Sequence, residues 1–138
     1  MRVQIEDFEF NLDGIVDEDA IQKAIAKSCA LVERKAKEKA PKDTGALRQS
    51  ITSKVEKEDG EWVGTVYTPL EYAPYVEYGT GLFAEGGNGR KDVPWSYQDD
   101  KGDWHTTSGM KPQPYMRPAL NEAREDIIRF IKEAVVDD

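Results

Sequence analysis

The segment Tyr72-Ala-Pro-Tyr-Val-Glu-Tyr-Gly-Thr80 lies near the middle of the chain, between two regions with the composition of β-strands. Tyr72, Tyr75 and Val76 are spaced i, i+3 and i+4, which places side chains on one face of a helical turn. We therefore predict a short helix whose aromatic face, with Tyr78 nearby, packs against a sheet. A tyrosine buries its ring but needs a partner for its hydroxyl, which suits the margin of a core or a subunit contact.

The residues on either side of this segment predict two hairpins. Ile51, Ser53 and Val55 alternate with polar residues, and an apolar run over 62–67 follows the dipeptide Asp59-Gly60. Asp-Gly between two such runs is a strong hairpin signal. On the other side, residues 94–97 and 104–107 flank an acidic turn, and a four-residue loop would place Tyr97 directly across from Trp104 as an aromatic pair. A mobile loop is predicted for residues 82–92, because this segment contains the sequence Gly-Gly-Asn-Gly at 86–89 and little apolar material.

Three further segments have helical or strand patterns. An apolar series with helical spacing over 21–36 follows Asp19, which with Gln22 has the form of a capping box, and Pro41 ends the pattern. A short helix is expected next, with Asp43 or Thr44 as its cap. Pro118 suits the first turn of a last helix, which carries an apolar stripe.

The N-terminal residues predict a strand. Val3 and Ile5 alternate with polar residues, and Phe8, Phe10 and Leu12 alternate in the opposite phase. That phase change at residues 6–7 predicts one bent strand with a bulge.

Composition and charge exclude several classes to which this protein could belong. The 138 residues carry a formal net charge of −8, with 33% charged residues and no long apolar run. We expect one domain, no membrane span and no signal peptide, and hence a cytoplasmic protein. Nucleic-acid surfaces and anionic membranes both attract basic proteins, so neither is an expected ligand.

The residue types that carry chemistry are sparse. His105 is the single histidine and Cys29 the single cysteine, which excludes a catalytic triad, a disulfide within the chain and a Cys/His metal cluster. We expect a surface histidine, and in Cys29 an inert small residue within a helix rather than a reactive thiol. Several aspartates lie between residues 92 and 103, but their spacing matches no calcium loop and suits a turn instead. No catalytic residue, cofactor or metal is predicted, so the chain is not expected to be an enzyme.

Three segments together resemble a known family. These are Ala40-Pro-Lys-Asp-Thr-Gly-Ala-Leu-Arg-Gln-Ser-Ile51, the tyrosine segment, and Pro112-Gln-Pro-Tyr-Met-Arg-Pro-Ala-Leu120. In this order and spacing they resemble the head–tail joining (neck or tail-completion) proteins of long-tailed bacteriophages and prophages, over about residues 18–136. The positions that carry the motifs or the expected core are Pro41, Thr44, Gly45, Leu47, Tyr72, Tyr75, Val76, Tyr78, Gly79, Pro114, Met116 and Pro118.

The resemblance implies an α+β fold, like that of tail-terminator proteins, in which a long N-terminal helix and a C-terminal helix pack on an antiparallel sheet. It implies a single head–tail joining domain over 1–138, with a loop and hairpin extension at about 82–109. It also implies a virion-assembly role: a ring of this chain, most simply a hexamer, between the head connector and the tail terminator or tail tube. Such a protein is assembled in the bacterial host and ends in the virion neck, with DNA passing through the lumen without specific binding.

A ring needs a contact between two different surfaces of the same chain. Aromatic side chains are common anchors in interfaces, and the extension concentrates them on a small element. We expect the contact to involve Trp95, Tyr97, Trp104, Leu82 and Phe83. The alternative is a prophage-encoded module that binds a host protein as a monomer or dimer through the same residues.

Overall fold

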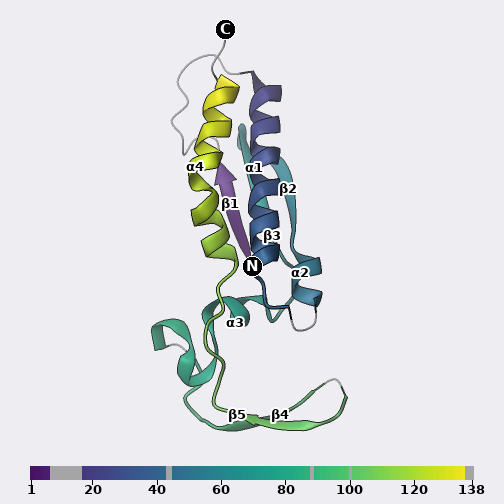
Figure 1. The fold of residues 1–138 in the computed structure, drawn as a ribbon, viewed down its shortest axis with the longest axis vertical. Coiled ribbons are helices and arrows are strands. Elements are labelled where there is room, and N and C mark those ends of the chain that lie inside the picture. The colour runs from purple at the N-terminus through teal and green to yellow at the C-terminus, as the bar shows by residue number, and fades with distance from the viewer. Residues whose placement is uncertain (7–16, 43–44, 88, 100, 136–138) are drawn as a thin grey trace. The chain divides into compact units, whose positions relative to one another are not determined.

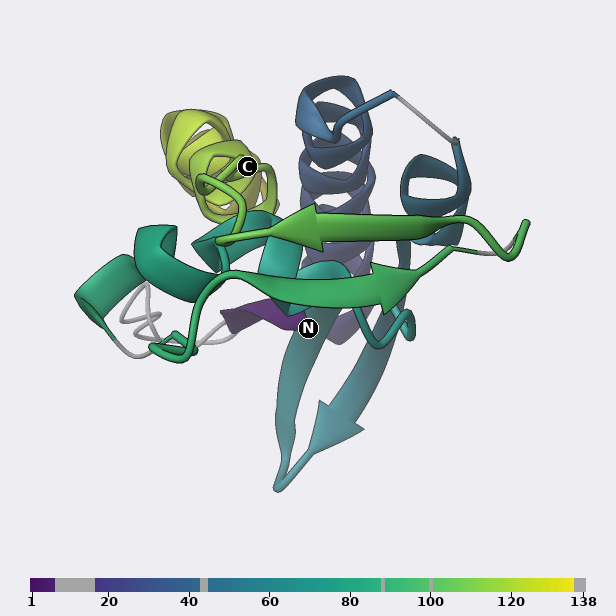
Figure 2. The same cartoon turned by 90° about the horizontal axis from the view of Figure 1, so that it is seen from below.

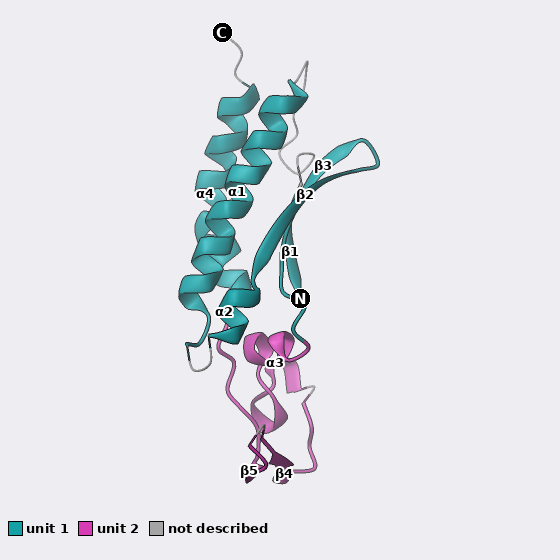
Figure 3. Cartoon of the chain, turned by 90° about the vertical axis from the view of Figure 1, so that its right-hand side faces the viewer, with its two compact units in different colours: residues 1–70, 115–138 teal, residues 71–114 magenta. Residues whose placement is uncertain are grey.

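The structure is a computed structural model. It describes residues 1–6, 17–42, 45–87, 89–99 and 101–135. The chain forms two compact units (Figure 3), which we call the helix–sheet unit (Met1–Leu70 with Tyr115–Asp138) and the inserted unit (Glu71–Pro114).

The helix–sheet unit contains a three-stranded antiparallel sheet in the order β1-β3-β2. The strands are β1 (Arg2–Glu6), β2 (Thr52–Glu58) and β3 (Glu61–Tyr67). Asp59 and Gly60 connect β2 to β3 with φ angles of 51° and 83°. Two consecutive positive φ values are the signature of a two-residue hairpin turn, so the predicted hairpin is confirmed.

One face of this sheet lies against a helix. Gly64 on β3 is paired with Ile5 on one side and Val55 on the other, and a side chain at Gly64 would meet Ile25 and Cys29 of the helix. Val3, Ser53 and Val66 lie on the same face, two residues along each strand. The predicted alternation of Ser53 and Val55 is therefore confirmed.

Two long helices run side by side on this sheet (Figure 1): α1 (Glu18–Lys39) and α4 (Met116–Val135). Acidic residues open α1, and Lys37 and Lys39 lie in its last turn, as the helix dipole favours. The helix ends before Pro41, as predicted. The fold is α+β, with both helices and the antiparallel sheet, which confirms the expected fold class.

The cap of α1 differs from the prediction. Asp17, not Asp19, occupies the N-cap, and its Oδ1 accepts hydrogen bonds from the backbone N–H groups of Asp19 (2.9 Å) and Ala20 (3.4 Å). Asp19 is already inside the first turn, so its own N–H is one of the free donors that a cap satisfies. Asp17 and Asp19 are both suitable N-cap residues, and the predicted one, Asp19, was wrong.

Two sequence predictions fall on residues outside the described ranges. The bulge and the second apolar phase at Phe8, Phe10 and Leu12 are among them; β1 itself is described to Glu6. The second helix, α2 (Ala46–Ser50), is present and has Gly45 at its N-cap position with φ 72°. The N-cap residue is therefore not Asp43 or Thr44, as predicted, because the helix begins one residue further along; these two residues lie outside the described ranges.

The core of the helix–sheet unit is built from both helices and the sheet. Its fully buried side chains include Ile25, Val32, Val66 and Ile131. Tyr115 is also fully buried, and its hydroxyl hydrogen-bonds the Met1 sulfur at 3.7 Å. Tyr115 lies between Pro114 and Pro118 in a segment without helical or strand periodicity, so the sequence pattern does not mark it as a core residue.

The inserted unit consists of short elements. These are α3 (Ala73–Tyr78), the 3₁₀ helices η2 (Gly81–Phe83) and η3 (Glu85–Gly87), and the strands β4 (Trp95–Gln98) and β5 (Trp104–Thr107), which pair in antiparallel orientation (Figure 2). The region expected to be a loop therefore begins with two helical turns. Among the described residues, no helix is both long enough and apolar enough to cross a membrane.

Candidate functional site

The tyrosines of α3 point outward. The short helix itself was predicted, but Tyr72, Tyr75 and Tyr78 are all exposed, Tyr75 at 58%. Ala73 and Val76 are buried instead, together with Glu77. These residues have the same i, i+3, i+4 spacing as the predicted face, displaced by one position. The prediction of an aromatic face packed on a sheet is therefore wrong: spacing indicated a helix, but it could not tell which of two adjacent faces was buried.

Residues of α3 and of the segment that comes after it in the sequence line a groove of about 750 Å³. Tyr75 and Tyr78 line it together with Trp95, and the Arg90 guanidinium lies 5.0 Å from the centre of the Trp95 ring. A cation over an indole face is attracted by the negative charge of the ring face. Trp95 is half-buried here, so it differs from the other predicted contact residues, which are exposed.

Glycines at 79 and 81 let the chain return on itself behind this groove. The backbone N–H of Thr80 donates to the carbonyl of Met110, and that of Leu82 donates to Ser108, both at 2.9 Å. Gly81 has φ 60°, and a side chain there would collide with the Ser108 carbonyl oxygen. Gly79 also has positive φ, as its place after the helix predicted. The Gly-Thr-Gly sequence thus joins the outgoing and returning parts of the inserted unit.

The hairpin formed by β4 and β5 has a different register from the predicted one. Tyr97 lies opposite His105, with ring centres 5.3 Å apart, and Trp104 lies opposite Gln98. The connection spans 99–103, one residue longer than the predicted loop. The Asp99 carboxylate accepts the backbone N–H groups of Lys101 and Asp103 at 2.9 Å each, which closes this longer turn. A shift of one residue moves a side chain to the other face of a strand, so the Tyr97–Trp104 pair does not form.

The consequence is a hairpin with aromatic residues on both faces. Trp104 is on one face and is 69% exposed, while Tyr97 is on the other and is 46% exposed. Leu82 and Phe83, in η2, are exposed at 62% and 42%. Four of the five predicted contact residues therefore are exposed large apolar side chains of one unit, and the fifth, Trp95, lines the groove.

The turn also contains the one histidine. The His105 Nε2 lies 2.7 Å from Asp99 Oδ2, and this hydrogen bond, with those from the backbone of Asp103 and Lys101, lowers the pKa of Asp99. His105 is exposed, as predicted. Because the shift lowers the pKa of an acid, its small contribution to stability is present at neutral pH and is lost as the pH falls through the pKa of the folded state.

Of the other motif positions, Leu47, Val76 and Met116 are buried. Pro114 ends the inserted unit, and Pro118 is in the first turn of α4, as predicted. Thr44 lies outside the described residues. Among the residues that the structure describes, no three His, Cys, Asp or Glu side chains gather closely enough to hold a metal ion.

Cys29 is expected to resist alkylation in the native protein. It is buried, and burial, with the nearby charge of Glu33, raises its pKa to about 12. The thiolate is the reactive form, so at pH 8 iodoacetamide should modify Cys29 only after denaturation. Intact mass before and after adding guanidinium measures this; rapid modification of the native chain would show that α1 opens away from the sheet.

A comparison with family models places the chain among known proteins. Residues 6–79, more than half of the sequence, match the family described as "Bacteriophage HK97-gp10, putative tail-component". The comparisons with curated proteins and with solved structures found no match. Three segments carry the resemblance to phage head–tail joining proteins. The family match covers the first of them and all but the last residue of the second, and it confirms that resemblance. The chain thus belongs to the HK97-gp10-like family of phage tail components and is a structural protein of a phage virion.

Proposed function

We propose that copies of this chain form a ring, most simply a hexamer, that joins the head connector to the tail terminator or tail tube. The observation that supports it is the two-sided aromatic hairpin, with Trp104 exposed on one face and Tyr97 on the other. An element with large aromatics on both faces cannot bury both against a single flat surface. A position between neighbouring protein surfaces would cover both.

The symmetry of a ring determines the type of contact between its subunits. A cyclic ring with more than two subunits uses a heterologous interface, in which one surface meets a different surface of the next copy. We propose that Leu82, Phe83, Trp95, Tyr97 and Trp104 form one half of that interface. In this proposal 1–138 acts as a single head–tail joining domain, and residues 82–109 are the extension that makes the contact.

The charge of the chain supports a passive role toward DNA. Each copy carries a formal charge of −8, so a ring of six would carry about 48 negative charges in excess. Such a wall repels the phosphate backbone rather than holding it. We propose that the genome passes through the lumen without specific binding.

Native mass spectrometry of the purified chain, with and without purified tails that lack this protein, tests the proposal. We expect a closed oligomer of six copies, either free or on the tail end. If the chain stays monomeric or dimeric in both samples and restores no head joining, the ring is excluded. A host-binding module would then be the better description.

A further inference from the structure

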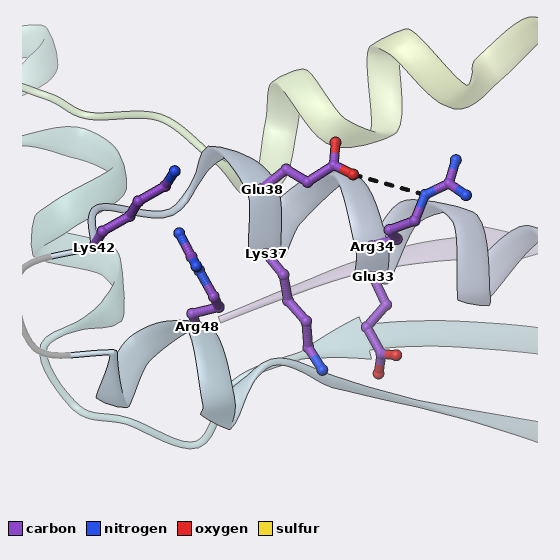
Figure 4. A pocket seen from close by; sticks show the side chains of 6 residues that line it. All are labelled: Glu33, Arg34, Lys37, Glu38, Lys42 and Arg48. Carbon is purple, nitrogen blue, oxygen red and sulfur yellow. Dashed lines mark ion pairs between the residues drawn. The ribbon is translucent and has the colours of Figure 1, made fainter.

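The helix–sheet unit contains a basic groove of about 440 Å³, on a chain that is acidic as a whole. It lies where the end of α1 meets α2 (Figure 4). Four cationic and two carboxylate side chains line it: Glu33, Arg34, Lys37, Glu38, Lys42 and Arg48. We refer to these six residues as the basic groove.

Among the described residues, neither carboxylate of the groove forms an ion pair with Arg48. Glu38 is turned toward Arg34, with 3.9 Å between Arg34 Nε and Glu38 Oε1, and points away from Arg48 (Figure 4). Within the described part of the chain, no hydrogen-bond acceptor reaches Nε or Nη2 of Arg48, although both atoms are buried. The charge of this guanidinium therefore has no partner in the described residues.

Ordinary helix electrostatics explain part of the groove but not this residue. Lys37 is in the last turn of α1, where the helix dipole favours cations without any ligand. Arg48 comes from the separate helix α2, and its Nε and Nη2 atoms are buried although the residue lines the groove. A buried N–H group of a charged side chain without an acceptor destabilises the fold, so an acceptor supplied from outside would be used.

From this we infer that the basic groove binds a carboxylate of a second copy of this chain, that of Asp103, with Arg48 as the principal contact. This inference rests on the proposed ring. Arginine presents parallel N–H donors that match the two oxygens of a carboxylate. Arg48 is half-buried, so a small rotation of its long side chain turns those donors toward an incoming oxygen.

Charge favours this occupant. Copies with a charge of −8 repel one another, and a pair of opposite charges across their contact offsets part of that repulsion. Asp103 is exposed on the hairpin that the proposed function places in the interface. Its side chain forms no ion pair among the described residues, whereas the carboxylate of Asp99 is already bound by its own turn and by His105.

A charge exchange tests the pair. Arg48→Glu and Asp103→Arg should each weaken assembly at least tenfold, and the double variant should restore it to within about threefold of the parent. Lys23→Glu is the matched control, because Lys23 is exposed on α1 outside the groove and the net charge changes by the same amount. Native mass spectrometry over a dilution series measures the assembled fraction of the parent, the three variants and the control.

Arg48→Met separates assembly from folding. It keeps the apolar part of the side chain and removes the unpartnered charge, so the midpoint of urea unfolding of the isolated chain should stay the same or rise. Assembly should still weaken at least tenfold. A purely structural arginine would instead lower the unfolding midpoint.

Three results would overturn the inference. If the parent assembles and the charge exchange restores nothing, this contact is wrong while the ring stands. If the parent does not assemble even on tails, the ring and this contact fail together. If fluorescence anisotropy shows duplex DNA binding that is lost in Arg48→Glu, the groove is a phosphate site and not a subunit contact.

Discussion

Replacing Gly64 with valine is expected to lower the free energy of unfolding by about 3 kcal/mol. At Gly64 the backbone of β3 lies directly against side chains of α1. A Cβ there would come within 2.7 Å of Ile25 Cγ2 and nearer still to the sulfur of Cys29. Valine suits a strand by itself, so its intrinsic preference should help slightly. The expected loss of stability therefore comes from the added methyl groups, which push the helix and the sheet apart.

Urea unfolding followed by circular dichroism measures this change, and Gly60→Ala is the control. Gly60 has φ 83° but has no atom within 4 Å of an added Cβ, so alanine there costs about 1–2 kcal/mol from backbone strain alone. Gly64→Ala adds a single methyl group and should also destabilise the chain. Adding Cys29→Ala to that variant should restore part of the lost stability, because it makes room for the new methyl group. An unchanged midpoint for Gly64→Val would mean that α1 does not pack on β3 as described.

The second large effect is expected on assembly. Trp104→Ala should weaken the ring by about 2 kcal/mol or more per contact, about 30-fold, because interface tryptophans contribute most to binding when they are buried by a partner. In the free chain Trp104 is 69% exposed, so its removal should leave the unfolding midpoint almost unchanged.

Thr106→Ala is the matched control, since Thr106 is exposed on the same face of the hairpin two residues away. Native mass spectrometry at several concentrations should show the control assembling like the parent and Trp104→Ala dissociating. Equal assembly of all three would move the contact away from this face, and Tyr97→Ala would then test the opposite one.

Several elements could be predicted because their causes are local. The Asp59-Gly60 turn needs positive φ at both positions, and few residue types tolerate that. Helices α1 and α4 repeat apolar residues with a period that burial on one face requires. The family, too, follows from short motifs in a fixed order, and the match over 6–79 confirms it.

The exposed surface was harder to predict. Both possible buried faces of α3 have helical spacing, and the small residues Ala73 and Val76 were buried while the tyrosines were left outside. In the second hairpin, the hydrogen bonds of the Asp99 carboxylate lengthened the turn by one residue, which moved Trp104 to the face opposite Tyr97. Each of these errors is a shift by one residue, and periodicity alone does not resolve such a shift.

The sequence by itself determined the two long helices and the first hairpin, because each follows from chemistry within a few residues. The α+β class and the phage family followed from the resemblance that three motifs carry in their order and spacing. Only the tertiary structure decided which side chains are exposed and which are left without partners. Arg48 shows the difference: its neighbours in sequence say nothing of its burial, which arises where α2 meets the end of α1. Burial and hydrogen-bond partners depend on residues far apart in sequence, and the fold alone brings those together.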